Sequence, residues 1–271
     1  MASVRRKFTG HLPLMPTKKA LGQHWLRDRT ILHYIADAAA IHPSDTVLEI
    51  GPGLGTLTSV LLERAKQVIA VEFDDELARK LPGQFPGKDL VVKNQDILTF
   101  DLDALSPGYI VVANVPYYIT SKIVQRLMTA ANKPHVAVLL VQKEVARRLA
   151  AEPGDMSLLA VSAQVYATVR LGIEVPRQFF TPPPEVDSQV VVLETRPEPL
   201  IAATDEQHFF RLVRAGFAER RKKLRSSLAG GLHLEKATID ELLQKATINP
   251  EARAQELSIT DWQNLLKHTT Q

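Results

Sequence analysis

Short apolar runs alternate with amphipathic stretches through the first half of the chain. Amphipathic patterns typical of helices occur at 29–41, 55–65, 74–81 and 119–131. Five runs are almost continuously apolar and rich in β-branched residues, as buried parallel strands are. These runs are 47–50, 68–72, 90–94, 109–115 and 136–142. Because strands that alternate with helices join through right-handed crossovers, the pattern predicts a mostly parallel α/β sheet that is covered on both faces.

The later part of this sheet follows a different pattern. Two helical stretches, 143–151 and 156–163, come directly after the fifth apolar run. Apolar runs at 164–175 and 189–194 then follow each other without an intervening helix. Consecutive strands of this kind pair antiparallel. We therefore expect an antiparallel edge on the otherwise parallel sheet.

The remainder of the chain predicts a small all-α domain. Pro197 and Pro199 interrupt the pattern, and we place the boundary between two domains there, as residues 1–197 and 198–271. Thr204 and Thr260 are expected N-caps, each with a glutamine three residues later. The expected helices cover 205–218, 220–228, 236–245, 251–256 and 260–267.

Composition excludes several kinds of chemistry. The 271 residues include no cysteine, so disulfides, thiolate zinc sites and cysteine nucleophiles are excluded, and we expect no bound metal. No apolar stretch approaches the ~20 residues of a membrane span. A cytoplasmic protein without a membrane partner is the expectation.

The formal net charge of +3 hides two basic clusters. The first cluster contains Arg5, Arg6, Lys7, Lys18, Lys19, Arg27 and Arg29. The second contains Arg220, Arg221, Lys222, Lys223 and Arg225. From charge alone, a solvated face and a phosphate-binding surface are equally good interpretations.

Candidate cofactor residues stand at the ends of three successive strands. Residues 49–55 read E-I-G-P-G-L-G, which lacks both the dinucleotide fingerprint and the P-loop lysine, so alone it is equally well a structural turn. Glu72 ends the next strand, where a carboxylate can bind ribose hydroxyls or simply begin a helix. Asp96 follows the third and can accept from an adenine amine or cap a turn. Together the three tips predict an adenosine site without pyrophosphate, for which S-adenosylmethionine (SAM) is the obvious ligand.

The fourth strand ends in A-N-V-P-Y-Y-I-T-S, residues 113–121. The SAM methyl group is already activated, so an enzyme has mainly to position the nucleophile. The Asn114 side-chain oxygen and the Pro116 carbonyl can each accept an N–H of an exocyclic amine, and Tyr117 can stack on the base. The alternative is a strand-ending turn with core aromatic residues.

Four ordered motifs resemble one family. N-V-P-Y-Y is similar to the Asn-Leu/Ile-Pro-Tyr motif of adenine-amine methyltransferases, and 18–26 resembles the basic entry motif of ribosomal RNA adenine dimethyltransferases. Residues 180–188 resemble that family's loop after the core. Residues 217–228 resemble the signature of its small-subunit branch. The resemblance covers about 17–267 and implies a Rossmann-like SAM-dependent methyltransferase domain with a helical, RNA-engaging domain.

The resemblance also implies roles for particular residues. The catalytic positions would be Asn114, Pro116, Tyr117 and Phe180, with the rings of Tyr117 and Phe180 enclosing the target adenine. The cofactor positions would be Gln23, His24, Leu26, Gly51, Gly53, Glu72, Asp96 and Asn114. The RNA contacts would be Arg220, Arg221, Lys222, Lys223 and Arg225. Two positions depart from the pattern: His24 and Tyr118 stand where relatives often have asparagine.

The implied activity is dimethylation of two adjacent adenosines in the 3′-terminal hairpin loop of small-subunit (16S) rRNA. The enzyme would be a monomer that acts on the 30S subunit during its biogenesis. One alternative is a methyltransferase for large-subunit rRNA or DNA adenine. Another is a non-catalytic assembly or transcription factor on the same fold. The basic clusters and the helical appendage argue against a third, a small-molecule methyltransferase.

Overall fold

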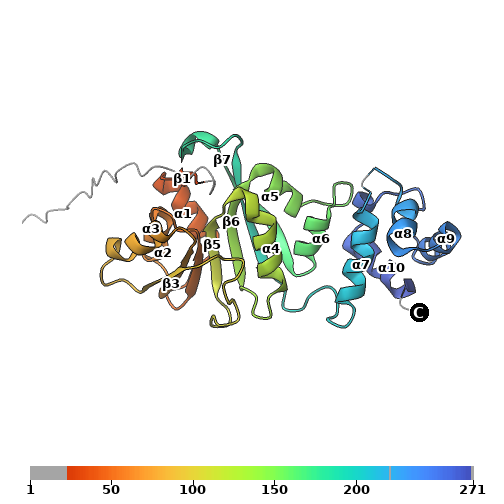
Figure 1. Ribbon diagram of the computed structural model, residues 1–271, viewed down its shortest axis with the longest axis horizontal. Helices are drawn as coiled ribbons and strands as arrows, with labels where there is room; N and C mark the ends of the chain where they lie inside the picture. Colours follow the sequence, from red (N-terminus) through yellow and green to blue (C-terminus); the bar gives the residue numbers. More distant parts are fainter. Residues whose placement is uncertain (1–22, 220, 270–271) are drawn as a thin grey trace, which may run out of the picture.

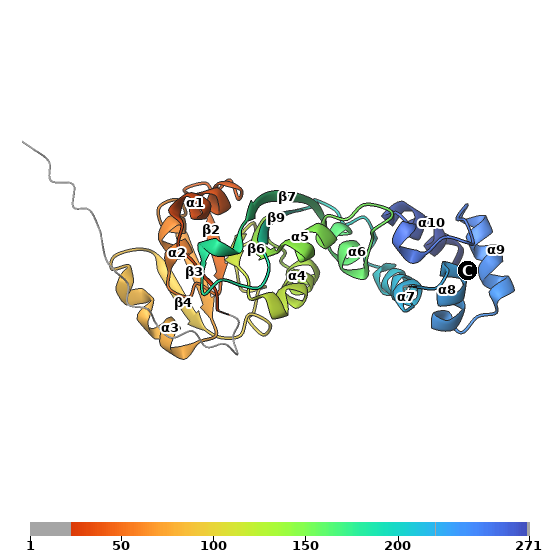
Figure 2. The same cartoon turned by 90° about the horizontal axis from the view of Figure 1, so that it is seen from above.

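The computed structural model describes residues 23–219 and 221–269. It shows an elongated molecule in which a sheet covered by helices forms the larger part (Figure 1). The group α7–α10 lies at one end, beyond α6, and α3 and β4 lie near the other (Figure 2). The first basic cluster up to Lys19 and Arg220 of the second lie outside the described residues.

The predicted α/β sheet with an antiparallel edge is confirmed. Seven strands have the order β4-β3-β2-β5-β6-β9-β7, in which β9 is antiparallel to both of its neighbours and the other pairs are parallel. The strands are β2 (Thr46–Ile50), β3 (Gln67–Glu72), β4 (Leu90–Asn94), β5 (Ile110–Asn114), β6 (Val136–Gln142), β7 (Ala167–Val175) and β9 (Ser188–Thr195). Ile50 pairs with both Val71 and Ala113, so the carboxyl ends of β3, β2 and β5 are level.

Both faces of this sheet are buried, which explains the continuous apolar runs. Along β5, Ile110 and Val112 point into one core and Val111 and Ala113 into the other, as the two-residue period of a strand requires. Helices α1 (Arg29–Asp37) and α2 (Thr56–Leu61) cover the first face. Helices α4 (Thr120–Thr129), α5 (Lys143–Leu149) and α6 (Leu158–Gln164) cover the second. Helix α3 (Asp75–Lys80) follows β3.

A second, two-stranded sheet brings distant motifs together. Strand β1 (Trp25–Leu26) pairs antiparallel with β8 (Phe180–Thr181). This pairing places the entry motif beside the loop motif, although about 155 residues of chain separate them. Short 3₁₀ turns complete the fold: η2 (Pro82–Gln84), η3 (Tyr117–Ile119), η4 (Arg177–Phe179) and η5 (Ala254–Glu256).

The helical group consists of α7 (Glu206–Phe217), α8 (Leu224–Leu232), α9 (Lys236–Lys245) and α10 (Ile259–Thr269). A Cβ atom on Gly216 would lie 2.4 Å from Trp262, so α7 and α10 can approach this closely only with glycine there. Helix α8 begins at Leu224 rather than at 220, since the backbone N–H of that buried residue donates to the Ala252 carbonyl.

The expected caps in this group are wrong. Asp205, not Thr204, occupies the N-cap of α7, and its side chain makes no capping bond. At α10, the Ser258 hydroxyl accepts from the Asp261 backbone N–H at 3.1 Å, and the Asp261 carboxylate accepts from the Ser258 N–H at 2.8 Å. This reciprocal cap starts the helix two residues before the point that Thr260 would set. The expected helix at 251–256 is the 3₁₀ turn η5.

Candidate active site

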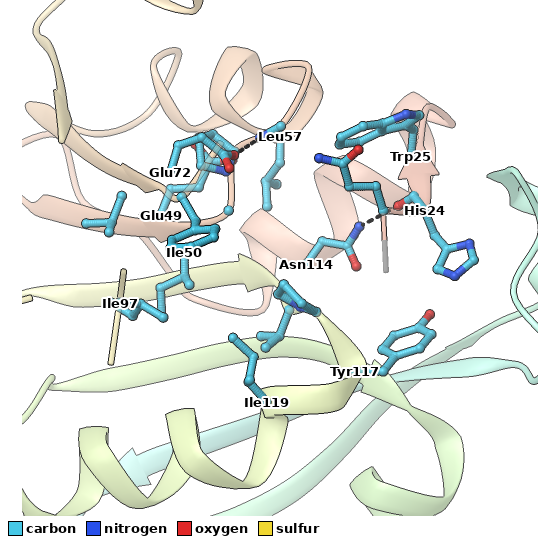
Figure 3. A pocket seen from close by; sticks show the side chains of 18 of the residues that line it. His24, Trp25, Glu49, Ile50, Leu57, Glu72, Ile97, Asn114, Tyr117 and Ile119 are labelled. Atoms are coloured by element: carbon cyan, nitrogen blue, oxygen red, sulfur yellow. Dashed lines mark hydrogen bonds between the residues drawn. The ribbon is translucent and has the colours of Figure 1, made fainter. Parts of the chain in front are cut away.

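A cavity of about 320 Å³ opens where the carboxyl ends of β2, β3, β4 and β5 meet (Figure 3). That volume is within the range of small-molecule sites. Its walls come from segments far apart in the sequence: 23–26, 49–53, the end of β3, 95–98 and 114–119. The level carboxyl ends of adjacent strands bring these segments together.

The glycine turn after β2 requires its glycines. Gly51 and Gly53 have φ values of +66° and +57°, in the left-handed region that glycine adopts without strain. An added Cβ on Gly53 would lie 2.3 Å from the Trp25 ring. The Gly53 backbone N–H donates to Glu72 Oε2 at 3.0 Å. The turn is therefore fixed from one side by an aromatic ring and from the other by a carboxylate.

Glu72 is held by backbone donors at both of its oxygens. Oε2 accepts from Gly53, and Oε1 accepts from the Asp74 N–H at 2.9 Å. The side chain is only 7% exposed, and this burial raises the pKa of Glu72 while the two N–H donors lower it. Each carboxylate oxygen retains a second lone pair, so the group can still accept from ligand hydroxyls at the cavity wall.

Glu49 is a second, more deeply buried carboxyl group beside Glu72. It is 1% exposed, and burial, together with the neighbouring Glu72 carboxylate, raises its pKa to about 8, although Thr58 lowers it. Its Oε2 atom has no hydrogen-bond partner among the described residues. Near neutral pH the Glu49 carboxyl group is mostly protonated, so it adds little negative charge to this side of the cavity.

Asp96 lines the cavity after β4 and stabilises its own turn. Its Oδ1 atom accepts from the Leu98 N–H at 2.9 Å, the arrangement of an Asx turn. Within the described residues, no hydrogen bond engages Oδ2. The turn role and a ligand role are therefore compatible, because they use different oxygen atoms.

Asn114 lies at the centre of the cavity with its amide oriented (Figure 3). Its Nδ2 donates to the His24 backbone carbonyl at 3.2 Å, so Oδ1 is the end that can accept from a ligand amine. The Pro116 carbonyl already accepts from the Ile119 N–H and the Thr120 hydroxyl, both at 3.3 Å. Of the two acceptors in the motif, the Asn114 side-chain oxygen is therefore more available to a ligand than the Pro116 carbonyl oxygen.

Tyr117 presents its ring beside Asn114. Its hydroxyl is 2.6 Å from the hydroxyl of the buried Ser188, and burial raises the pKa of the phenol, which keeps it neutral. The His24 imidazole stacks on this ring, with centroids 5.9 Å apart and planes at 19°. His24 Nδ1 is 2.8 Å from the Pro182 carbonyl oxygen.

Phe180 is not among the described residues that line the cavity, and its predicted role beside Tyr117 stays a prediction. Its side chain is 3% exposed and is buried in the core that contains Leu26. The cause is the β1–β8 register, which pairs Phe180 directly with Leu26. The ring that stacks on Tyr117 in the structure is that of His24.

Other predicted cofactor positions lie at the cavity wall. Gln23, His24 and Leu26 all line it, together with Gly51 and Gly53. The cavity is also lined by residues for which the sequence predicts no role: Trp25, Glu49, Phe73 and Tyr118. Phe73 and Tyr118 are 60% and 62% exposed. In the sequence, only their position indicates that Phe73 and Tyr118 belong to the site, since each directly follows a predicted site residue.

The second basic cluster is partly neutralised by neighbouring acids. Lys222 pairs with Glu219 at 2.6 Å, and Lys223 pairs with Glu251. Both lysines are more than half exposed, and ion pairs in such positions contribute little to stability, so phosphates can compete for them. Arg221 is exposed and joins none of the ion pairs between described residues.

Arg225 differs from the rest of the predicted RNA cluster. Its guanidinium pairs with Asp240 at 2.7 Å, with both side chains about one-third exposed, and the pair joins α8 to α9. Packing between helices is the simpler explanation for this residue. In the part of the chain that the structure describes, no cluster of three His, Asp or Glu residues is arranged to hold a metal, and no helix is long and apolar enough to cross a membrane.

Comparisons with known proteins point to one family. A family model described as ribosomal RNA adenine dimethylase matches residues 15–271. A relative named ribosomal RNA small subunit methyltransferase A, from Dehalococcoides mccartyi, is 42% identical over 269 residues, which cover 98% of this chain and 92% of the relative. A relative of the same name from Moorella thermoacetica is also 42% identical, over 98% of this chain and 94% of its own length.

Two solved structures are similar over almost the whole chain. The 23S rRNA methyltransferase ErmE has a TM-score of 0.75 and 30% identity, covering 91% of this chain and all of that one. A dimethyladenosine transferase from Plasmodium falciparum has a TM-score of 0.76 and 29% identity, covering 89% and 96%. The likeness therefore includes both the sheet and the helical group.

Proposed function

This chain belongs to the ribosomal RNA adenine dimethylase family, and on that premise we propose that it dimethylates two adjacent adenosines in the 3′-terminal hairpin loop of 16S rRNA, with SAM as methyl donor. The observation that carries the proposal is the oriented amide of Asn114, which directs an acceptor oxygen into a cavity bordered by Glu72 and Asp96. The small-subunit relatives support the choice of rRNA.

The cavity fits the proposed cofactor. The glycine turn at Gly51 and Gly53 lets backbone approach a ligand closely, and it lies beside the paired acceptor oxygens of Glu72. We assign Glu72 to the ribose hydroxyls, Asp96 to the adenine amine, and the segment 23–26 to the wall that covers the ligand. When bound, SAM supplies a methyl group that is already activated for transfer.

The residues at the reacting end position the target amine. Asn114 Oδ1 accepts one N–H of that amine and so fixes the direction of the nitrogen lone pair. As the nitrogen gains a methyl group it becomes positively charged, and the same oxygen stabilises that charge until the proton is lost to solvent. Tyr117 stacks on the base. Such stacking contributes ~1–3 kcal/mol, comparable to the few kcal/mol needed to unstack a base.

We assign residues 198–271 to RNA binding, with Arg221, Lys222 and Lys223 as phosphate contacts. Residues 1–197 carry the SAM site. We propose that the enzyme acts as a monomer. The substrate places the enzyme in the cytoplasm, where small subunits are assembled.

The test is transfer of radiolabelled methyl groups from SAM to undermethylated small subunits, followed by nucleoside analysis. We expect N6,N6-dimethyladenosine, and Asn114→Ala should abolish transfer while SAM binding persists. Because ErmE is a structural neighbour, large subunits belong in the same assay. Label only in the large subunit would overturn the substrate assignment, and full turnover by Asn114→Ala would overturn the role of the amide.

A further inference from the structure

The turn that begins at Asp96 is held by a side chain of helix α4. Residues 96–100 form a compact turn, in which the Asp96 carbonyl accepts from the Phe100 N–H at 3.0 Å. The guanidinium of Arg126 also reaches this turn. Its Nε donates to the Ile97 carbonyl at 3.1 Å, and its Nη2 donates to the Phe100 carbonyl. One forked side chain thus holds the turn at two points.

This turn separates the cavity from a second hollow. Residues 95–98 line the cavity, whereas residues 101–103 and Arg126 line a hollow of about 400 Å³. Leu98 lines both, so the turn lies between them. Arg126 therefore approaches the turn from the side away from the cavity. Any effect of Arg126 on a ligand in the cavity has to pass through the turn.

Helix α4 also borders the reacting end of the cavity. It begins at Thr120, directly after the segment 114–119, and the Thr120 hydroxyl donates to the Pro116 carbonyl at 3.3 Å. Arg126 lies two turns further along the helix, about 9 Å away at 1.5 Å per residue. The same helix thus contacts the segment with the acceptor amide and the turn that carries Asp96, so the separation of these two parts is fixed by one regular element.

We infer that Arg126 is a positioning residue for cofactor recognition, because its two hydrogen bonds hold the turn so that Asp96 Oδ2 faces the adenine amine of SAM. This inference rests on the proposed function, since it uses the assignment of Asp96 to that amine. Asp96 Oδ1 accepts from the Leu98 N–H within the turn, so the direction of Oδ2 depends on how the turn is held. Arg126 therefore determines how well the site distinguishes adenine from a purine without the amine.

The rest of this loop has its own support. The side-chain amide of Asn132, which lies beyond the end of α4, donates to the Leu102 and Leu105 carbonyls at 3.2 and 2.7 Å. The side chains of Ile97 and Phe100 are buried in the core. Loss of the arginine fork should therefore loosen the turn locally and leave the loop folded.

The test compares two ligands that differ at the position of the amine. S-adenosylhomocysteine is SAM without the transferred methyl group, and S-inosylhomocysteine has a carbonyl oxygen in place of the adenine amine. Their Kd values are measured by calorimetry on the full chain. Because a carboxylate accepts from the amine, wild type should bind the first ligand roughly 10- to 100-fold more tightly. Arg126→Met keeps a long side chain without donors and should reduce this preference by roughly fivefold or more.

Three further variants isolate the role of the fork. Arg126→Lys keeps the charge but lacks a rigid fork with two donor directions, so its preference should lie between those of wild type and Arg126→Met. The matched control is Arg148→Met, at an exposed arginine of α5, and it should keep the wild-type preference. In an Asp96→Ala background, Arg126→Met should change the preference little further, because the residue through which it acts is absent.

Several results would overturn the inference. A wild-type preference in Arg126→Met, or an equal weakening of both ligands, would mean that the arginine only supports packing. A loss of preference that persists in the Asp96→Ala background would mean that Arg126 acts by another route. If Arg126→Met does not fold, Arg126→Lys decides, and a wild-type preference in that variant excludes the fork. Failure of the proposed function is distinguishable, since wild type itself would then bind neither ligand or show no preference for adenine.

Discussion

The buried carboxyl group of Glu49 should make the free energy of unfolding depend on pH, and the size of this effect can be worked out from the structure. Its carboxyl group is buried between Thr58 of α2 and Glu72 of β3, and burial raises its pKa from 4.5 to about 8. Because the folded-state pKa is above the unfolded one, the folded protein binds this proton more tightly. The stabilisation is complete below pH 4.5 and is lost as pH rises toward 8.

The size of the effect follows from the shift. One pKa unit corresponds to ~1.36 kcal/mol, so a shift from 4.5 to about 8 is worth on the order of 5 kcal/mol over the whole range. Glu49→Gln has nearly the same shape and cannot ionise. The unfolding free energy of wild type, relative to Glu49→Gln, should therefore fall by up to ~1.4 kcal/mol per pH unit between pH 5 and 8.

The assay is urea unfolding of both proteins at several pH values across that range, followed by circular dichroism. Glu72 also has a raised pKa, but it is present in both proteins and its contribution largely cancels in the difference. Parallel stability curves for the two proteins would refute the reasoning, because they would mean that Glu49 ionises as easily in the fold as in the unfolded chain. A difference that grows with pH in the opposite sense would mean that the buried carboxylate is stabilised.

Three further predictions concern the cofactor turn and the RNA surface. Gly53→Ala should lower the stability and the SAM affinity more than Gly51→Ala does. Both substitutions strain a left-handed backbone by about 1–2 kcal/mol, but only Gly53→Ala also displaces the Trp25 ring. Equal losses in the two variants, measured by denaturation and by calorimetry, would refute this. Glu72→Ala should lower the affinity for SAM at least tenfold. It should also destabilise the fold, since two backbone N–H groups lose their acceptor. Unchanged SAM affinity would refute the ribose assignment. Arg221→Glu should weaken binding to small subunits without changing the affinity for SAM. The slope of the subunit-binding constant against salt concentration, on logarithmic axes, should fall by the amount expected for about one lost phosphate contact. An unchanged slope would show that Arg221 is only solvated.

The sheet was predictable from sequence because each central strand is buried on both faces. A run such as 109–115 is then recognisable as a buried strand from its continuous apolar residues alone, whichever helices cover it. That Glu72 and Asp96 line one cavity was predictable for a related reason, since they follow or end neighbouring parallel strands and must lie at one edge of the sheet. In these cases, local pattern and topology together are sufficient.

Other features depend on contacts between distant segments. Phe180 is buried because it pairs with Leu26 in a two-residue strand, and Arg225 forms an ion pair with Asp240 on another helix. Trp25 lies within the entry motif 18–26, but an aromatic residue beside a leucine is equally consistent with a core position. No spacing in the sequence encodes these pairings, so only the fold reveals them.

The segment 23–26 connects the two halves of the site. Trp25 packs against the glycine turn at Gly53, while the carbonyl of the preceding residue, His24, orients the amide of Asn114. The segment is fixed by β1–β8 pairing and by the Thr56 hydroxyl, which donates to the Leu26 carbonyl at 2.9 Å. A ligand that orders the glycine turn therefore also stabilises the position of the carbonyl that directs Asn114. We therefore expect cofactor binding and presentation of the amine acceptor to be coupled through these four consecutive residues.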